Sequence, residues 1–257
     1  MIDSASYTLG ANQHLTNARI LYDPLIGTVA GTGSNPAYAA NDYTSQRWEL
    51  VPGANSWVLT AAGTVDCVFI AAHNLTGKTV DIQTATVVGG PYTTRRSITP
   101  TDSSTICVLF NNAGVPYTVA EVKILVNEGS DIAIGIIRAG EALQMPIALY
   151  GGHRPLNLNR ITEAQQQFSE TGQWLGRIIK RRAVASSYDW EYLTATWYRA
   201  NFEPFALTLP LSPFCIVGNP SRFPDDVGFV WTDRDVEPSA MGVNDYWSVS
   251  IGVTGYY

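Results

Sequence analysis

The sequence is poor in the residues from which metal sites and disulfide frameworks are built. Its 257 residues include only 3 cysteines and 3 histidines. The cysteines, Cys67, Cys107 and Cys215, are odd in number and form no CxxC pair, which argues against a disulfide framework and a zinc site. Each stands among apolar residues, so we expect all three to be small buried core residues. The histidines lie far apart and form no HxH or HxxxH pair.

Nucleotide-binding and catalytic motifs are missing as well. Residues 77–79 supply the end of a phosphate-binding loop, but Ala72 stands where that motif needs its first glycine. No GxSxG segment is present. His73 follows an apolar run, and we interpret it as a strand-end histidine with satisfied hydrogen bonds. The acidic stretch 233–237 lacks the glycine and distal glutamate of a calcium loop and reads as a solvated turn. The sequence therefore predicts no catalytic residue, metal or cofactor.

Charge and hydropathy exclude further classes of protein. Charged residues make up 15% of the chain, and the net charge of −6 gives no general attraction to nucleic acid or to an anionic membrane. No apolar run approaches the roughly 20 residues of a membrane helix, and the first residues lack the pattern of a signal peptide. A hydrophobic fraction of 46% predicts a sizeable folded core.

The chain does contain many short runs rich in Val, Ile, Thr, Tyr and Trp between turn residues, a pattern typical of all-β proteins. In the first half we expect seven strands, at 47–51, 56–61, 66–72, 79–86, 104–111, 121–127 and 131–138. The run 66–72 (DCVFIAA) is continuously apolar, which predicts a strand buried on both faces. Residues 28–43 should form an irregular loop. This set of strands predicts a two-sheet jelly-roll sandwich.

Glycines and a proline within 146–155 predict a boundary between two domains, 1–147 and 148–257. A β-hairpin should follow, with its turn at 169–172. We expect further strands at 205–211, 214–217, 228–232 and 247–253. Residues 190–200 fit either a strand or a short helix.

The predicted hairpin carries the one dense basic cluster of the chain: Arg177, Lys180, Arg181 and Arg182. On a regular strand Arg177 and Arg181 share one face, while Lys180 and Arg182 share the other. Charge on both faces favours an arm that projects toward a charged neighbour. A solvated edge strand, protected from aggregation by its charges, explains the cluster equally well. Nucleic-acid binding is the third choice, because the chain is acidic and no aromatic residues are interleaved with the basic ones.

The second half carries several distinctive segments in order: FSETGQWLGR and the basic strand, WEYLTATWYRANFEPF, PFCIVGNP, GFVWT and YWSVSIGVTGY. In this order they resemble the distal tail and minor tail proteins of long-tailed bacteriophages. The resemblance implies a tail-tube-like β-sandwich with a long hairpin, which assembles as a homohexameric ring between the tail tube and the baseplate hub in the virion, after synthesis in the host cytoplasm. It also implies that the hairpin, and with it the basic cluster, contacts the neighbouring subunit. The family supplies no catalytic residues.

The segment WVLTAAGTVDCVFIAAHNLTGKTVDIQ of the first half resembles galactose-binding-like jelly rolls. That resemblance implies an alternative function, a carbohydrate-binding module that recognises a host-surface glycan. Its candidate contact residues are the aromatic side chains of Trp48, Trp57 and Tyr92. A hydrolase of surface polysaccharide is a third hypothesis, disfavoured because the sequence offers no evident acid/base constellation.

Overall fold

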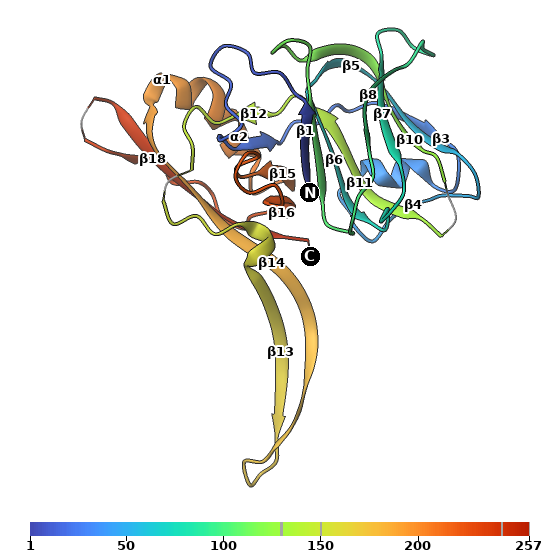
Figure 1. Cartoon of the computed structure of the whole chain (residues 1–257). Coiled ribbons are helices and arrows are strands. Elements are labelled where there is room, and N and C mark those ends of the chain that lie inside the picture. The colour runs from blue at the N-terminus through green and yellow to red at the C-terminus, as the bar shows by residue number, and fades with distance from the viewer. Residues whose placement is uncertain (129–130, 150, 243, 257) are drawn as a thin grey trace.

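The computed structural model describes residues 1–128, 131–149, 151–242 and 244–256. The protein is all-β, with three sheets and one short helical region (Figure 1). The outer sheet has the strand order β3 (Thr28–Gly31), β5 (Asn55–Val65), β10 (Tyr117–Val126), β7 (Val80–Ala85) and β8 (Thr93–Ile98). The middle sheet has the order β1 (Ile2–Ser6), β9 (Ile106–Phe110), β6 (Cys67–His73), β11 (Ala133–Gly140) and β4 (Trp48–Glu49).

The third sheet has the order β12 (Leu143–Gln144), β2 (Arg19–Leu21), β15 (Phe214–Val217), β16 (Val227–Trp231), β18 (Tyr246–Gly255), β14 (Trp174–Thr194) and β13 (Arg160–Phe168). The short strand β17 (Ser239–Ala240) pairs with β18. Two 3₁₀ turns, η1 (Pro36–Ala40) and η2 (Leu156–Leu158), complete these regions. All seven strands predicted in the first half are confirmed, although β1, β2, β3, β8 and β12 were missed.

The middle sheet is buried on both of its faces, as the apolar run 66–72 predicts. Successive residues of β6 alternate between two cores: Val68 and Ile70 pack against the outer sheet, whereas Cys67 and Phe69 pack against the third sheet. The second of these cores takes in Cys215 and Phe229 from β15 and β16. All three cysteines lie in this layer as free, buried thiols, which confirms the prediction.

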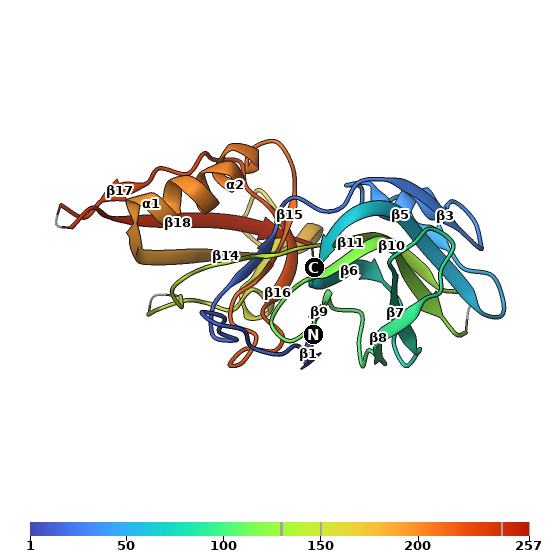
Figure 2. The same ribbon diagram turned by 90° about the horizontal axis from the view of Figure 1, so that it is seen from above.

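The two halves of the chain therefore share an apolar core and lie side by side (Figure 2). Strands β2 and β12 belong to the first half of the chain but pair in the third sheet. This differs from the predicted division at residue 147. Strands of two or three residues are too short to show a period of two, so the sequence pattern could not place them.

A short helical region covers the other face of the third sheet. It runs through α1 (Ala195–Trp197), a π-helical turn η3 (Tyr198–Phe202) and α2 (Glu203–Thr208). The predicted strand 205–211 is therefore wrong. Phe202, Phe205 and Leu209 are spaced by three and four residues, and all three enter the core beneath the helices. Residues 190–200 combine both expected structures, because β14 continues to Thr194 before the helix begins.

Residues 28–43, predicted as an irregular loop, contain β3 and η1. The prediction was wrong because small residues hid an edge strand. Gly31 permits this pairing, since a Cβ there would lie 2.5 Å from the Ser56 carbonyl oxygen of the adjacent strand.

A buried ion pair joins the third sheet to the middle sheet beside the shared core. Nη1 of Arg19, on β2, lies 3.9 Å from Oδ2 of Asp66, which precedes β6, and both side chains are almost inaccessible. Nη2 of Arg19 donates to Oε1 of Gln144 at 2.7 Å, and the guanidinium lies over the Tyr7 ring. Burial raises the pKa of Asp66 to about 6, although Arg19 and the Ala142 N–H both favour the carboxylate.

This raised pKa predicts a pH-dependent stability. The folded state holds the Asp66 proton more tightly than the unfolded chain, so its stabilising contribution is complete below about pH 4 and is lost as the pH rises through about 6. Relative to Asp66→Asn, the wild-type free energy of unfolding should fall by about 2 kcal/mol from pH 4 to pH 7. Urea denaturation at a series of pH values measures this difference. Parallel curves for the two proteins would contradict it, and the exposed Asp235→Asn serves as the control.

Candidate functional site

The hairpin formed by β13 and β14 is the most conspicuous feature of the surface. Strand β14 has 21 residues, and its inner half pairs with β18 from Val184 to Thr194. Its outer half pairs with β13 alone, so the hairpin projects far from the body (Figure 1). We call residues 160–182 the arm. Its predicted turn is confirmed: Gly172 has a φ of 81°, and the Ser169 N–H donates to the Gln173 carbonyl at 2.8 Å.

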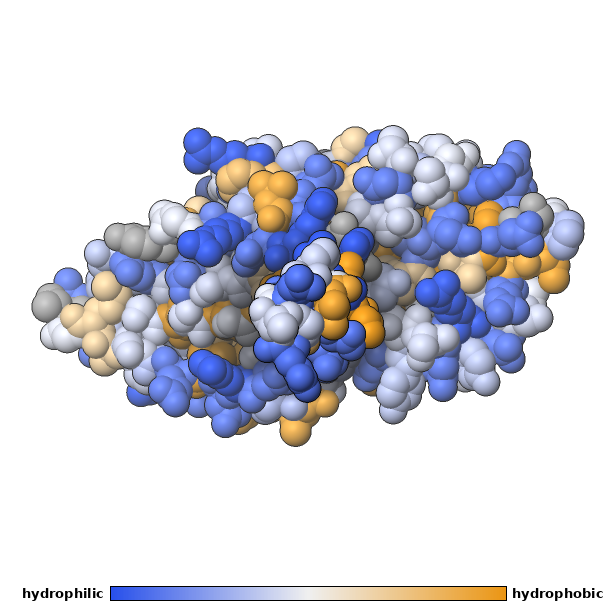
Figure 3. Space-filling view, turned by 90° about the horizontal axis from the view of Figure 1, so that it is seen from below, coloured by the Kyte–Doolittle hydropathy of each residue, from blue (hydrophilic) through white to orange (hydrophobic). Residues whose placement is uncertain are grey.

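The arm exposes large apolar side chains that the protein itself leaves uncovered. In Figure 3, where the arm points toward the viewer, apolar surface lies beside hydrophilic surface at the centre of the view. Six side chains with exposed fractions between 39% and 65% contribute: Ile161, Phe168, Trp174, Leu175, Ile178 and Ile179. Contiguous exposed apolar surface is typical of interaction sites.

Two irregularities in β14 decide which residues share a face of the arm. Lys180 is an extra residue, because Glu163 pairs with Arg181 while the next residue, Ala164, pairs with Ile179. Leu175 is inserted in the same way nearer the tip. Residues directly opposite each other share a face, so an inserted residue reverses the alternation beyond it.

The predicted faces of the basic cluster are therefore wrong. Arg177 and Arg182 share one face of the arm, opposite Gln166 and Thr162, whereas Arg181 lies on the other. The predicted faces hold only for a regular strand, and no glycine or proline at Lys180 marks the bulge in the sequence.

The structure places all four basic residues of the predicted cluster on the arm, where all are exposed. Nε of Arg181 forms a cross-strand ion pair with Oε2 of Glu163 at 2.8 Å, and such exposed pairs contribute little stability. Arg177, Lys180 and Arg182 form no ion pair with any other residue that the structure describes. These three cations are available to a partner.

A buried polar cluster fixes the base of the arm. Asp226, which is fully buried before β16, accepts from Nε2 of His153 at 2.7 Å and from the Leu156 N–H at 2.7 Å. The Tyr188 hydroxyl, on β14, donates to the same carboxylate at 3.3 Å. Nδ1 of His153 faces the Ser187 carbonyl oxygen at 3.1 Å. The cluster thus connects η2, β14 and the start of β16.

Both ring nitrogens of His153 face oxygen atoms, an arrangement that suits the doubly protonated imidazolium. Burial lowers the pKa of His153, but the hydrogen bond and charge of Asp226 outweigh burial and raise it. The carboxylate needs Gly218 beside it, because a Cβ there would lie 1.9 Å from Oδ2 of Asp226. Sequence reasoning missed this cluster, since its members are separated by up to 73 residues.

Two of the three aromatic residues predicted to contact a glycan are inaccessible to a ligand. Trp48 and Trp57 are buried in the core of the sandwich, where their indole N–H groups donate to the carbonyl oxygens of Thr32 and Pro36. Neither ring can stack on a sugar, so these two predictions need correction. Trp57 is buried because alternate residues of β5 face the core, and Trp57 is one of these.

Tyr92 is half-buried, and its hydroxyl donates to Oε2 of Glu121 at 2.6 Å. Burial together with this hydrogen bond raises the pKa of Tyr92 to about 12. Nζ of Lys123 lies 4.7 Å from the ring centroid and covers one face of the ring. The side chain is therefore already engaged within the outer sheet.

A different set of aromatic residues lines a groove of about 530 Å³ between the two halves, which we call the interdomain groove. Its lining residues are Asn41, Asp42, Tyr43, Thr44, Leu211, Pro213, Phe229 and Trp231. The buried Arg138 fixes one wall, because its Nη2 donates to the Asn41 carbonyl and to Oδ1 of Asp42, both at 2.6 Å.

His73 has the satisfied strand-end role that was predicted. Its Nδ1 accepts from the Leu75 N–H at 3.2 Å, so Nε2 carries the proton and donates to the Ser104 carbonyl at 2.9 Å. Burial lowers the pKa of His73 to about 4, and the ring is neutral. Within the described residues, no cluster of three or more His, Cys, Asp or Glu side chains could hold a metal ion. In the same part of the chain, every helix is too short or too polar to cross a membrane.

No protein-family model and no curated protein matches this chain. Among solved structures, the chain is similar to a chitosan-binding module of a chitosanase/glucanase from Paenibacillus sp. IK-5, with 15% identity and a TM-score of 0.40 over 46% of this chain and 97% of that one. It is also similar to CBM62 of Clostridium thermocellum Xyl5A, with 17% identity and a TM-score of 0.39 over 47% and 99%.

A third similar structure is the family 32 carbohydrate-binding module of Clostridium perfringens NanJ in complex with galactose. It shows 18% identity and a TM-score of 0.36 over 44% of this chain and 91% of that one. These structural neighbours are carbohydrate-binding modules and match less than half of the chain. Similarity at this level assigns no family and carries no argument about what the chain binds.

Proposed function

We propose that this chain is a non-catalytic structural subunit that assembles into a homo-oligomeric ring through its arm. The observation that carries the proposal is the exposed apolar surface on both faces of the arm. An isolated two-stranded hairpin is at best marginally stable in water, and this one exposes six large apolar side chains in addition. A second copy that covers the arm would stabilise the hairpin and bury its apolar side chains.

The free energy available from burying the apolar side chains of the arm is large enough to support self-association. Burying a fully exposed large apolar side chain contributes about 1.5–3 kcal/mol, so six that are about half exposed offer roughly 5–9 kcal/mol. Association costs reduce this sum, but a micromolar complex requires only about 8 kcal/mol, and the arm is only one side of the contact. Anchoring by Asp226 holds the base of the arm in place before it binds, which lowers the ordering cost.

The setting we propose is the tail tip of a long-tailed bacteriophage, with the tail tube protein and the baseplate hub as neighbours of a hexameric ring. The ordered segments of residues 160–257 support this setting through their resemblance to distal and minor tail proteins. The projecting arm is consistent with this setting, because the resemblance implies a long hairpin that contacts the next subunit.

Polar substitutions on the arm test the proposal. Trp174→Ser combined with Ile178→Ser removes apolar surface from both faces of the arm and should weaken self-association at least tenfold. Sedimentation velocity and electron microscopy of the full chain measure the change. Ile26→Ser combined with Val88→Ser alters two apolar side chains outside the arm that are more exposed than Trp174 and Ile178, and it should leave the rings intact. A wild-type protein that stays monomeric at high concentration would overturn the proposal.

The second candidate function is recognition of a host-surface glycan, and the interdomain groove favours it. Tyr43 is 64% exposed there and Trp231 is partly exposed, while Asp42 is held in place by Arg138. Aromatic rings pack against the apolar faces of sugars, and a fixed carboxylate accepts hydrogen bonds from their hydroxyl groups. The interdomain groove is therefore the proposed glycan-binding site, in place of the buried Trp48 and Trp57.

A glycan array probed with the full chain tests this function. Wild type should bind at least one class of glycan, and Tyr43→Ala should lower the affinity about tenfold by removing the exposed ring, a loss of about 1.4 kcal/mol. Tyr38→Ala is the control, because Tyr38 is an exposed tyrosine outside the groove. No binding across the array would dispose of this function, as would equal binding by both variants.

A further inference from the structure

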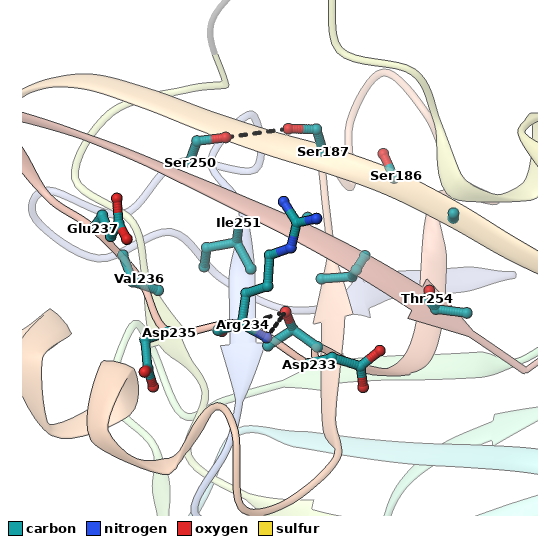
Figure 4. A pocket seen from close by; sticks show the side chains of 14 residues that line it. Ser186, Ser187, Asp233, Arg234, Asp235, Val236, Glu237, Ser250, Ile251 and Thr254 are labelled. Carbon is teal, nitrogen blue, oxygen red and sulfur yellow. Dashed lines mark hydrogen bonds between the residues drawn. The ribbon is translucent and has the colours of Figure 1, made fainter.

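The interaction surface that the arm requires has a counterpart on the body of the protein. A groove of about 860 Å³ lies between β18 and the loop 232–237 that follows β16 (Figure 4). Asp233, Asp235 and Glu237 are exposed along this loop, and Arg234 is the single basic residue among the residues that line the groove. We call it the acidic groove.

The acidic groove also leaves part of a strand edge unpaired. On the side away from β14, β18 pairs with β16 at Thr254 and Gly255 and with β17 at Trp247 and Ser248. Between these pairs, residues 249–253 have no ladder partner on that edge among the residues that the structure describes. An unpaired strand edge presents both N–H and C=O groups, which a partner can bind.

The floor of the acidic groove is built from small side chains. Ser187, Ser250 and Thr254 line it together with Gly252, and a Cβ added at Gly252 would meet no atom within 4 Å. Ser187 and Ser250 hydrogen-bond to each other at 3.3 Å, so these hydroxyls are partly engaged. The side chain of Arg234 extends across this floor toward Ser187 and Ser250 (Figure 4). The three carboxylates of the loop nevertheless outnumber this one cation, so the lining of the groove carries a net negative charge.

The arm carries the matching charge. Residues 160–182 include five basic and two acidic residues, and Arg177, Lys180 and Arg182 lack an ion-pair partner in the described chain. The lysine and both arginines have only hydrogen-bond donors at their ends, whereas the groove offers carboxylates and free carbonyl groups. Arg177 and Arg182 lie on the same face of the arm, so both can enter one groove.

The outer part of the arm, which includes Arg177, points away from the acidic groove of its own chain. The groove begins at Ala185 and Ser186, beside the base of the arm, and the arm extends from that point away from the body (Figure 1). Another copy is therefore needed to bring Arg177 into an acidic groove. The two contact surfaces are therefore different parts of the chain, and repeated head-to-tail contacts of that kind generate a closed ring or a filament.

We infer that the acidic groove receives the basic face of the arm, Arg177 and Arg182, from the neighbouring copy. This inference rests on the proposed assembly and adds its acceptor surface. It makes the interface heterologous, so each subunit contributes an arm to one neighbour and a groove to the other.

A charge exchange tests the pairing. The arm variant Arg177→Glu/Arg182→Glu and the groove variant Asp233→Lys/Asp235→Lys should each weaken self-association at least tenfold in sedimentation equilibrium. The chain that combines all four substitutions should recover association to within about threefold of wild type, because the two charge patterns are simply exchanged. Circular dichroism and the midpoint of thermal unfolding verify that each variant is folded.

Controls separate this inference from the proposed function. Arg47→Glu/Arg222→Glu changes the net charge by the same amount on exposed residues outside the arm and should assemble normally. If the arm variant dissociates while the groove variant assembles like wild type, the groove inference fails and the arm-mediated assembly stands. Failure of the four-substitution chain to recover also overturns the inference. A monomeric wild type would instead refute the assembly itself.

Discussion

The continuity of β14 is the constraint on which the rest of the structure depends. Its inner half is held in the third sheet by β18, and its outer half continues in the same strand as one side of the arm. A strand held along half its length directs its free half, so the arm has a defined direction. Asp226 strengthens the junction, because its carboxylate accepts hydrogen bonds from His153, from Tyr188 and from the backbone of Leu156. The arm thus projects as a positioned element with exposed apolar and cationic side chains.

The body is suited to carry such an element because its two halves share a core. The middle sheet packs on one side against the outer sheet and on the other against the third sheet, and β2 and β12 from the first half complete the third sheet. The arm therefore projects from a body in which both halves of the chain pack against each other. The Arg19–Asp66 pair between the third and middle sheets is costly to bury, which fits a role in fixing how these two sheets pack. The arm, the acidic groove and the interdomain groove then remain as exposed surfaces that a partner could contact.

Sequence patterns predicted those parts of the fold that depend on local periodicity. The apolar run of β6, the hairpin turn at Gly172 and the strands of the sandwich follow from alternation and turn chemistry. The helix α2 was misassigned because the short run 205–211, flanked by prolines, was predicted to be a strand. The faces of the arm were misassigned because the bulge at Lys180 has no sequence marker. The basic cluster of the candidate site was found from charge alone. The cluster around Asp226 and the acidic groove consist of residues that only the tertiary fold brings together. The burial of Trp48 and Trp57 likewise depends on the long-range pairing of strands.

The central claim is that a second copy covers the arm. Hydrogen–deuterium exchange of the backbone amides of 161–182 tests it most directly, measured over a range of protein concentrations that spans assembly. The account predicts that these amides exchange readily in dilute protein and become at least tenfold slower in the assembled state, while amides of β6, buried in both states, do not change. Arm amides that exchange at one rate throughout, in samples where rings are seen, would contradict it.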